Sequence, residues 1–529
     1  MAQAQIALAP PMAVDAALPS NKWAIAVAVA IGALLELIDT SIVNVALNEM
    51  QTSLGATMAQ ASWIVSSYAV ANVIILPLAA WLGHRFGKKK YFIFSLIGFT
   101  TASVLCGLST NLPMLVIARV LQGLTGGGLM AKAQSILFET FPKEEQATAQ
   151  AFFGAIVIAG PALGPTLGGT IVTNVGWRWI FFINLPLGIL AIMLCLSALP
   201  ADKPHTTAQK GIDWIAIAML AIGLGCMQTF LEEGNSHDWF DDPLIVLLCI
   251  ASIVSLVLFV RRELTVDEPV VDLRVLGYRS LWAGSILSVV MGMALYGGLF
   301  AVPIFAQSIM HYTSQQTGLM MLPGALTTAF LMPFAGRLSR KFDPRLLLIF
   351  GAVILAGALA MLSPMNPMTS GDNLFWPLIM RSVGTTFMFL PLSMASLGPI
   401  PRKDIASATG FFSLTRQLGG SVGVALLSTM LVRRQAFHAA VVAEKLVSND
   451  PATIERVNML TSAMMAKGAS AVEAKQRALA MLSGTVMQQG SIMSFADTFW
   501  LAGVIILLFL PLVFLLGKPE QGAKVDAGH

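Results

Sequence analysis

Two carboxylates, Glu36 and Asp39, stand inside an apolar run that covers residues 23–47. Residues three apart share one face of a helix, so both side chains point the same way if the run is helical. A carboxylate moved out of water holds its proton more tightly, and a neighbouring cation reverses that effect. The pattern therefore favours reversible proton binding, with Asp39 as the first candidate and Glu36 as the second. In the alternative, each acid only caps or salt-bridges a neighbouring helix.

Four basic residues also lie in apolar runs: Arg119, Lys132, Arg381 and Arg416. A charge inside a membrane costs at least a few kcal/mol, so each one calls for a function. Arg119 is the expected partner of Asp39, although it could instead bond backbone carbonyls. Four bases against two acids predict a net positive interior, which favours neutral or weakly acidic amphiphilic substrates. That inference weakens if the long side chains snorkel to the surface.

The elements that position these residues follow from hydropathy. The 529 residues are 56% hydrophobic and 11% charged, against roughly 25% charged in soluble proteins. About 20 apolar residues are needed to cross a bilayer as a helix. The sequence predicts an all-α membrane protein with fourteen such stretches, near 23–47, 61–82, 91–109, 112–138, 147–173, 179–199, 212–231, 243–260, 280–309, 315–336, 345–363, 374–397, 404–432 and 497–516.

The charges between these stretches orient the chain. Alternate connections are rich in Lys and Arg (84–90, 261–279, 337–345 and 402–403), whereas 232–242 is acidic. Basic loops stay on the cytoplasmic side. We therefore expect a multi-pass protein of the inner membrane with both termini in the cytoplasm, where 1–21 and 518–529 form disordered tails.

An internal repeat divides the chain. Residues 77–86 align with 333–342, Arg119 aligns with Arg381, and 147–153 align with 406–412, each at an offset of about 260 residues. The repeat predicts a six-helix bundle over 22–200, a linker with two extra membrane helices over 201–279, and a second six-helix bundle over 280–517.

Four segments carry a family resemblance: 37–47, 119–123, 160–169 and 177–186. With them the chain resembles the major facilitator superfamily, in its fourteen-helix drug/proton antiporter branch of EmrB/QacA-like multidrug exporters. The resemblance implies the major facilitator fold and secondary active transport by alternating access, not enzyme activity.

The family's loop between helices two and three departs in this chain. Ala80 and His84 replace the usual Gly and Asp, while Arg85, Gly87 and the following lysines fit. The resemblance thus implies a conformational role for Arg85 and Gly87 but not for a carboxylate at position 84, and whether His84 replaces it stays open.

Small residues recur every four positions in the segment 160–169, which predicts a bare helix face that packs closely on a neighbour. We expect this face, bent at its prolines, to slide during the transport cycle. The conformational candidates are Gly160, Pro161, Gly164, Pro165, Gly168 and Gly169.

Polar and aromatic residues in several predicted spans could line a central cavity, and the 28 methionines suit an adaptable apolar surface. The alternative is that most of them are packed or face lipid. The substrate-binding candidates are Asn44, Tyr68, Asn72, Gln122, Tyr296, Phe300, Gln307, Phe387, Arg381 and Arg416.

The polar stretch 433–494, between the last two spans, predicts a helical hairpin on the periplasmic side. Relatives in the resembling branch pair with a periplasmic membrane-fusion protein and an outer-membrane channel, which makes the hairpin a candidate docking element, or else a lid. The sequence has no Walker-type loop, and we predict no cofactor, metal site, catalytic site or nucleic-acid partner.

These observations predict a proton-coupled antiporter that exports amphiphilic drugs and other small toxic compounds, with the lipid bilayer, small amphiphiles and protons as its partners. The alternatives are an exporter dedicated to one metabolite, such as a siderophore or a fatty acid, and a membrane sensor or scaffold that transports nothing.

Overall fold

The computed structural model describes residues 21–202, 212–266, 268–366, 369, 371–444, 446 and 451–516, and within these it is helical without a strand. The helices of the first half are α1 (Lys22–Leu54), α2 (Met58–Phe86), α3 (Lys88–Leu108), α4 (Leu112–Gly126), α5 (Leu129–Thr140), α6 (Lys143–Val175), α7 (Trp179–Phe182) and α8 (Asn184–Ala198). Next come α9 (Trp214–Glu233) and α10 (Pro243–Thr265). The remaining helices are α11 (Arg279–Ser308), α12 (Ser314–Lys341), α13 (Pro344–Leu362), α14 (Gly371–Leu397), α15 (Ile405–Glu444), α16 (Pro451–Ala466) and α17 (Ala471–Leu508).

Local sequence signals start and stop these helices. α2 begins with a capping box in which Thr57 and Gln60 satisfy each other's backbone N–H groups, and α12 begins with the same device at Thr313 and Gln316. These two helices are the second members of their respective halves, so the internal repeat extends to the caps. α1 stops at Gly55, whose φ of 62° suits a residue without a side chain.

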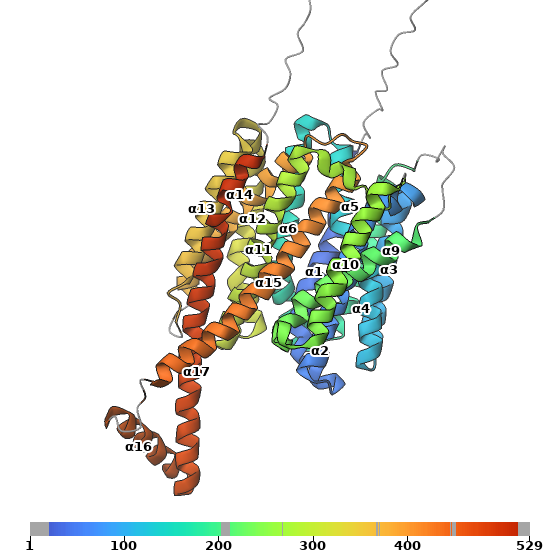
Figure 1. Ribbon diagram of the computed structural model, residues 1–529. Helices are drawn as coiled ribbons and strands as arrows, with labels where there is room; N and C mark the ends of the chain where they lie inside the picture. The colour runs from blue at the N-terminus through green and yellow to red at the C-terminus, as the bar shows by residue number, and fades with distance from the viewer. Residues whose placement is uncertain are drawn as a thin grey trace, which may run out of the picture.

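Among the described residues, thirteen helical segments are long and apolar enough to cross a membrane. Two of them are composite, because α4 and α5 form one passage, as do α7 and α8. α15 is not among the thirteen, but it runs beside α11 and α17 through the same bundle (Figure 1), so the expected count of fourteen passages is not contradicted. The expected all-α membrane architecture is thus confirmed.

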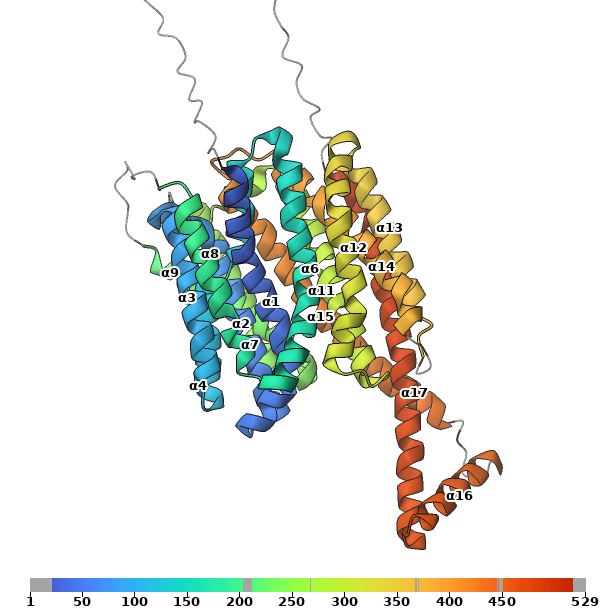
Figure 2. The ribbon, with the colours of Figure 1, turned by 180° about the vertical axis from the view of Figure 1, so that it is seen from behind.

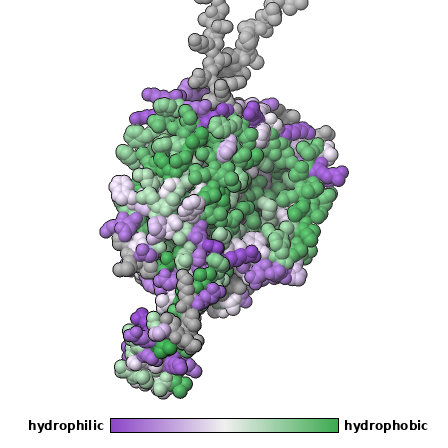
Figure 3. Space-filling view, turned by 60° about the vertical axis from the view of Figure 1, so that its left-hand side comes forward, coloured by the Kyte–Doolittle hydropathy of each residue, from purple (hydrophilic) through white to green (hydrophobic). Residues whose placement is uncertain are grey.

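The first and last described helical residues lie at the same end of the bundle, and α16 lies beyond the other (Figures 1 and 2). We call these ends the terminal face and the hairpin face. On the side that Figure 3 shows, apolar side chains cover most of the bundle between them, while polar residues gather toward the two ends. The outward side of α10 shows this composition, with Leu247, Ile250 and Ile253 all exposed, as expected for a surface that meets lipid.

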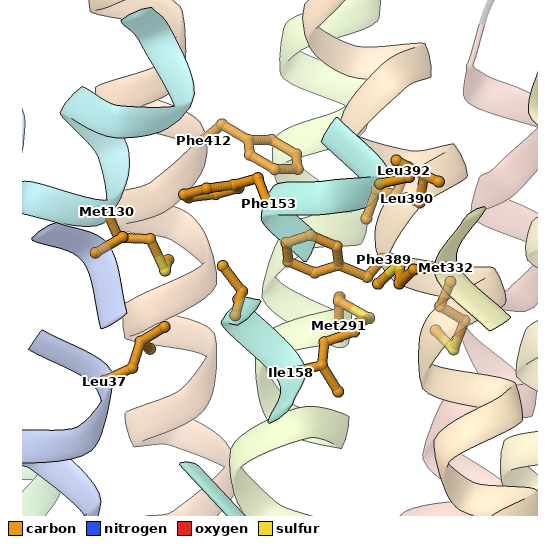
Figure 4. Packing of buried hydrophobic residues seen from close by; sticks show 14 of the residues in the cluster. Leu37, Met130, Phe153, Ile158, Met291, Met332, Phe389, Leu390, Leu392 and Phe412 are labelled. Carbon is orange, nitrogen blue, oxygen red and sulfur yellow. The ribbon is translucent and has the colours of Figure 1, made fainter. Parts of the chain in front are cut away.

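The two halves meet mainly along α6 with α12 and α2 with α15, and α5 also contacts α15 and α6 contacts α14. The inserted α9 and α10 pack on each other, and α9 also contacts α2 and α15. Between the halves the core is mainly aromatic and sulfur-containing, with Phe153, Phe389 and Phe412 near one another and Met130 beside them (Figure 4).

The hairpin differs from its expected form. α15 continues to Glu444, and α17 is one helix from Ala471 through Leu508, so the second hairpin arm and the last membrane passage are continuous. The helix that contains the expected last span, 497–516, thus begins at Ala471, and a start of the membrane passage near residue 497 within it stays a prediction. The base of the hairpin is fixed where Asp497 accepts hydrogen bonds from Arg434 (2.6 Å) and His438 (2.7 Å).

Candidate proton and substrate site

Asp39 lies at the centre of a closed polar network. Its Oδ2 accepts a hydrogen bond from Arg119 Nη1 at 2.6 Å, and its Oδ1 accepts from Gln122 Nε2 at 2.8 Å. Arg119 also donates through Nε to the backbone carbonyl of Ile64 (3.0 Å) and lies over the ring of Tyr68. The structure therefore brings together the acid and the base that the sequence pairs, and Asp39 and Arg119 are almost fully buried, at 0% and 1% exposed.

A further member of this network was missed from the sequence. Asn184, the first residue of α8, donates from Nδ2 to Asp39 Oδ1 at 2.9 Å and to Ser103 Oγ at 3.0 Å. It belongs to the segment 177–186 that carries the family resemblance. The sequence signal that could have identified Asn184 is its amide side chain in an otherwise apolar run. With it, every partner of Asp39 comes from the first half of the chain.

Glu36 has a different environment one turn earlier on α1. Its Oε1 accepts from Asn72 Nδ2 at 2.8 Å, and its Oε2 accepts from the backbone N–H of Met130 at 2.9 Å. Met130 is in the first turn of α5, so the carboxylate lies at the N-terminus of a broken membrane helix, where N–H groups and the helix dipole favour an anion. Both direct donors are neutral.

The break between α4 and α5 depends on two glycines. Gly128 has φ of 74°, in the left-handed region that favours glycine. A Cβ on Gly127 would come within 2.0 Å of Ile75 and 2.5 Å of the Gly123 carbonyl. The break leaves the backbone N–H of Met130 free to donate to Glu36. The two glycines therefore create the hydrogen-bonding environment of the Glu36 carboxylate.

Arg416 brings the second half of the chain to this position. It lies on α15, is 2% exposed, and contacts Met130 through Nη2 and Sδ at 3.9 Å. Its guanidinium lies over the rings of Phe389 and Phe412. Its Nη1 has no hydrogen-bond partner among the described residues, and its contact with Met130 brings the guanidinium close to the residue that donates to Glu36.

Arg381 lines a small pocket between α14 and its neighbours. Thr328, Ser382 and Thr385 give this pocket hydroxyl groups, and Ile158 of α6 closes it from the other half. The Arg381 Nε has no hydrogen-bond partner within the described part of the chain. The pocket combines a cation, hydroxyl groups and apolar walls, but its volume of about 20 Å³ is room for a water molecule rather than for an amphiphile in this conformation.

The other substrate-binding candidates are dispersed. Tyr68, Asn72 and Gln122 are buried within the first half, around Glu36 and Asp39, and Tyr296 and Phe300 are half-buried on α11. Asn44 and Gln307 are exposed. Phe387 packs edge-on against Phe350 of α13, with ring centroids 5.2 Å apart, so the structure does not bring it to the Arg381 pocket.

The small-residue face of α6 packs against α1. A Cβ on Gly164 would come within 1.9 Å of Ser41 Oγ, and one on Gly168 within 2.7 Å of Ile42, while Gly160 faces Leu37. Gly169 is adjacent to the backbone of Gln315 on α12. Pro161 and Pro165 lie inside the continuous helix α6.

At the terminal face the connection between α2 and α3 is held by a carboxylate from a distant segment. Asp202 accepts hydrogen bonds from the backbone N–H groups of Lys89 (2.9 Å) and Lys90 (3.0 Å). Gly87 has φ of 94°, and a Cβ there would collide with Asp202. Arg85 lies over the ring of Trp81, and Lys88 pairs with Glu139 at 2.6 Å.

The Major Facilitator Superfamily model matches residues 29–424. The chain belongs to this superfamily. It is 31% identical over 503 residues to the multidrug export protein EmrB of Escherichia coli K12, covering 95% of this chain and 96% of that protein. It is 32% identical over 495 residues to the fatty acid resistance protein FarB of Neisseria gonorrhoeae, covering 94% and 96%.

Solved structures agree on the fold. The human organic anion transporter MFSD10 aligns with a TM-score of 0.56 at 12% identity over 92% of this chain and 99% of that one. A D-xylose–proton symporter aligns with a TM-score of 0.54 at 15% identity over 78% and 90%. The family resemblance, the major facilitator fold and secondary transport rather than enzyme activity are thereby confirmed, and the chain is a multi-pass membrane protein.

Proposed function

We propose that this superfamily member is a proton-driven exporter of amphiphilic small molecules that works by alternating access. Its similarity to multidrug export proteins over almost the whole chain supports export. The observation that carries the proposal is the Glu36 site, where a buried carboxylate has only neutral direct donors and lies beside a cation of the opposite half. In this proposal Glu36 carries the exchanged proton.

Asp39 and Arg119, the first sequence candidates, receive a supporting role in the same proposal. Protonating Asp39 would break an ion pair of 2.6 Å that is fully enclosed, and breaking a buried pair costs about 3–5 kcal/mol. Glu36 loses no ion pair on protonation. Its partner Met130 also contacts Arg416, so movement of α15 against α5 alters the site directly.

The test uses E36Q and D39N in proteoliposomes with an imposed pH gradient. The substrates are an anionic, a zwitterionic and a cationic amphiphile, namely linoleate, norfloxacin and ethidium. We expect E36Q to abolish gradient-driven export while substrate counterflow, which moves no net proton, continues. D39N should weaken both modes together because it disturbs the fold. Gradient-driven export by E36Q at the wild-type rate would exclude Glu36 as the carrier.

In the proposed orientation the terminal face is cytoplasmic and the membrane is the inner membrane. The basic residues of the connections at the terminal face, including Lys88 to Lys90 and Arg337 to Lys341, support this orientation through the preference of Lys and Arg for cytoplasmic loops. The hairpin then stands in the periplasm.

Conformational roles follow from close packing. The proposed sliding surface is the small-residue face of α6, residues Gly160, Gly164 and Gly168 with Pro161 and Pro165, against α1, together with the contact of Gly169 with α12. Arg85 and Gly87 belong to the connection between α2 and α3 at the terminal face. In this proposal Asp202 supplies the carboxylate of that connection, whereas the family's loop has its own Asp at the position of His84.

We further propose that the hairpin docks a periplasmic membrane-fusion protein that leads to an outer-membrane channel. α16 has no buried residue, and Ile454, Met459 and Val472 are exposed among polar neighbours. Replacing residues 447–484 with a short linker removes the hairpin tip but keeps the Asp497 contacts. We expect the variant to retain proteoliposome export and to lose capture of the fusion protein. Unchanged capture would contradict docking and leave a lid as the alternative.

A second candidate is an exporter dedicated to one acidic metabolite. Two observations favour it: Arg381 Nε and Arg416 Nη1 have no hydrogen-bond partner among the described residues, and the chain is similar to a fatty acid resistance protein. The two functions are distinguished by measuring whether cells that produce the protein grow in the presence of several unrelated toxic compounds. Protection against many of them would support the broad exporter. Protection against linoleate alone would support the dedicated exporter.

A further inference from the structure

Lys132 is a buried amine that the mechanism above leaves unused. It lies on α5, is 9% exposed, and donates from Nζ to Ser95 Oγ at 2.7 Å. Its ammonium lies 4.1 Å from the ring centroid of Tyr91. No carboxylate of the described residues is within ion-pair distance of it. A charge inside a membrane without a counter-ion costs at least a few kcal/mol, so loss of the proton would remove that cost.

The location of Lys132 links Glu36 to the terminal face. Glu36 accepts a hydrogen bond from the backbone N–H of Met130, two residues before Lys132 on the same helix. Lys132 also lines a cavity of about 30 Å³, which is room for a water molecule. Gly83 and Lys88, at the end of α2 and the start of α3, line the same cavity, and both helices reach the terminal face there.

The helices α1, α3 and α15, which pack against α5, each supply a charged or titratable group for comparison. Arg416 of α15 is a guanidinium, which does not release its proton in proteins. Lys88 of α3 is neutralised by Glu139, and Tyr91 of α3 presents its ring to Lys132. Glu36 of α1 is the proposed carrier itself. Among these groups, Lys132, two residues from the Met130 donor of Glu36, has the chemistry both to accept a proton and to release it.

We propose that Lys132 is a second proton carrier, which takes the proton from Glu36 and passes it toward the terminal face. Because Glu36 and Lys132 are not in direct contact, a water between them relays the proton: the O–H bond of protonated Glu36 breaks as the water takes that proton, and the water gives one of its own to the neutral Lys132 amine. The step leaves a carboxylate, an ammonium and an unchanged water. The ammonium then gives a proton to water in the cavity and becomes neutral again. No electrons are transferred. This step rests on the proton-driven export proposed above.

The test compares K132R, which keeps the charge but cannot release a proton, with K132H, which can. Gradient-driven export and counterflow are measured in proteoliposomes with whichever of linoleate, norfloxacin and ethidium the wild-type protein transports. We expect K132R to reduce gradient-driven export at least about tenfold while counterflow stays within about twofold. K132H should keep gradient-driven export, with its pH optimum moved toward acid because imidazole binds protons more weakly than an amine. The matched control is Lys143→Arg, at an exposed position on α6.

Gradient-driven export by K132R at the wild-type rate would overturn the role of Lys132, and so would an equal loss of both transport modes, which is the signature of a structural role. If K132R does not fold, K132H decides, and an unshifted pH optimum overturns the proposal. Absence of gradient-driven export in the wild-type protein contradicts the proposed function itself, and this proposal falls with it.

Discussion

At the scale of residues, two carboxylates three positions apart on α1 have opposite environments. Asp39 has a guanidinium and two amide groups as donors, all from its own half of the chain. Glu36 has one amide and one backbone N–H, and a cation of the other half lies close by. A buried carboxylate that is paired with a cation and also bonded by amides stabilises a fold, whereas one held by neutral donors can exchange a proton at lower cost.

The Asn184 amide gives the first prediction. N184A removes one donor from Asp39 and leaves a buried acceptor partly unsatisfied, which costs about 1–3 kcal/mol. We expect a lower apparent melting temperature in detergent for N184A. The control is N44A, which removes an exposed amide that bonds only within α1 and should leave the melting temperature unchanged.

Coupling to Asp39 can be checked in the same assay. If Asn184 acts through the carboxylate, the double variant D39N/N184A should lose less stability than the sum of the two single changes. Simple additivity would contradict a shared network.

At the scale of elements, the ends of the helices decide how the inserted pair α9 and α10 is held. Asp213 caps α9 by accepting a hydrogen bond from the N–H of Ala216 (3.1 Å) and also pairs with Arg262 of α10 at 2.8 Å. The hydrogen bond from the Arg262 guanidinium, together with the backbone donors, holds the pKa of Asp213 below its usual range despite partial burial. One carboxylate therefore both starts α9 and ties it to α10.

The pH dependence of stability follows from this lowered pKa. Because the pKa of Asp213 is lower in the folded state, its contribution is complete above the unfolded value of about 3.9 and is lost as the pH falls through the folded pKa. We expect D213N, which keeps a good cap but loses the charge, to be less stable than wild type by up to about 1 kcal/mol. Melting curves from pH 3 to 8 should show a constant difference above pH 5 that vanishes at the acid end. A difference that grows toward pH 3 would contradict the ion pair.

The elements were easier to predict from the sequence than the site. A helix that crosses a lipid bilayer must be long and apolar. Hydropathy and the charges of the loops were therefore enough to locate the membrane-crossing helices. The break at Gly127 and Gly128 was not predicted, because glycines in membrane helices also serve close packing, and only the contact with Glu36 distinguishes the two uses. The pairing of Asp39 with Arg119 was predicted, whereas the Asn184 contact depends on how α8 returns to α1.

At the scale of the whole molecule, the inserted pair bridges the two halves near the hairpin face. Glu233 of α9 accepts hydrogen bonds from Ser62 (3.2 Å) and Ser66 (3.3 Å) of α2. On the other side, Gln228 of α9 donates to Ser421 of α15 at 2.8 Å, and Trp239 donates to Thr429 of α15 at 3.0 Å. If the halves separate at this face during transport, one of these two sets must break.

Trp239 tests that bridge. W239F keeps an aromatic ring but removes the donor to Thr429, and a neutral hydrogen bond contributes about 0.5–1.5 kcal/mol. We expect the ratio of hairpin-face-open to closed molecules to rise by up to about tenfold.

The measurement is labelling by a membrane-impermeant maleimide of a cysteine at position 166, in a background without Cys106, Cys195, Cys226 and Cys249. Thr166 lies against Gly318 of α12, where the halves meet. W214F, an exposed tryptophan at the opposite end of α9, is the matched control and should label like wild type. Faster labelling in W239F but not in W214F supports a bridge that resists opening, because the two variants remove the same indole and differ only in whether it joins the halves. Equal labelling in all three proteins would mean that the inserted pair follows one half passively.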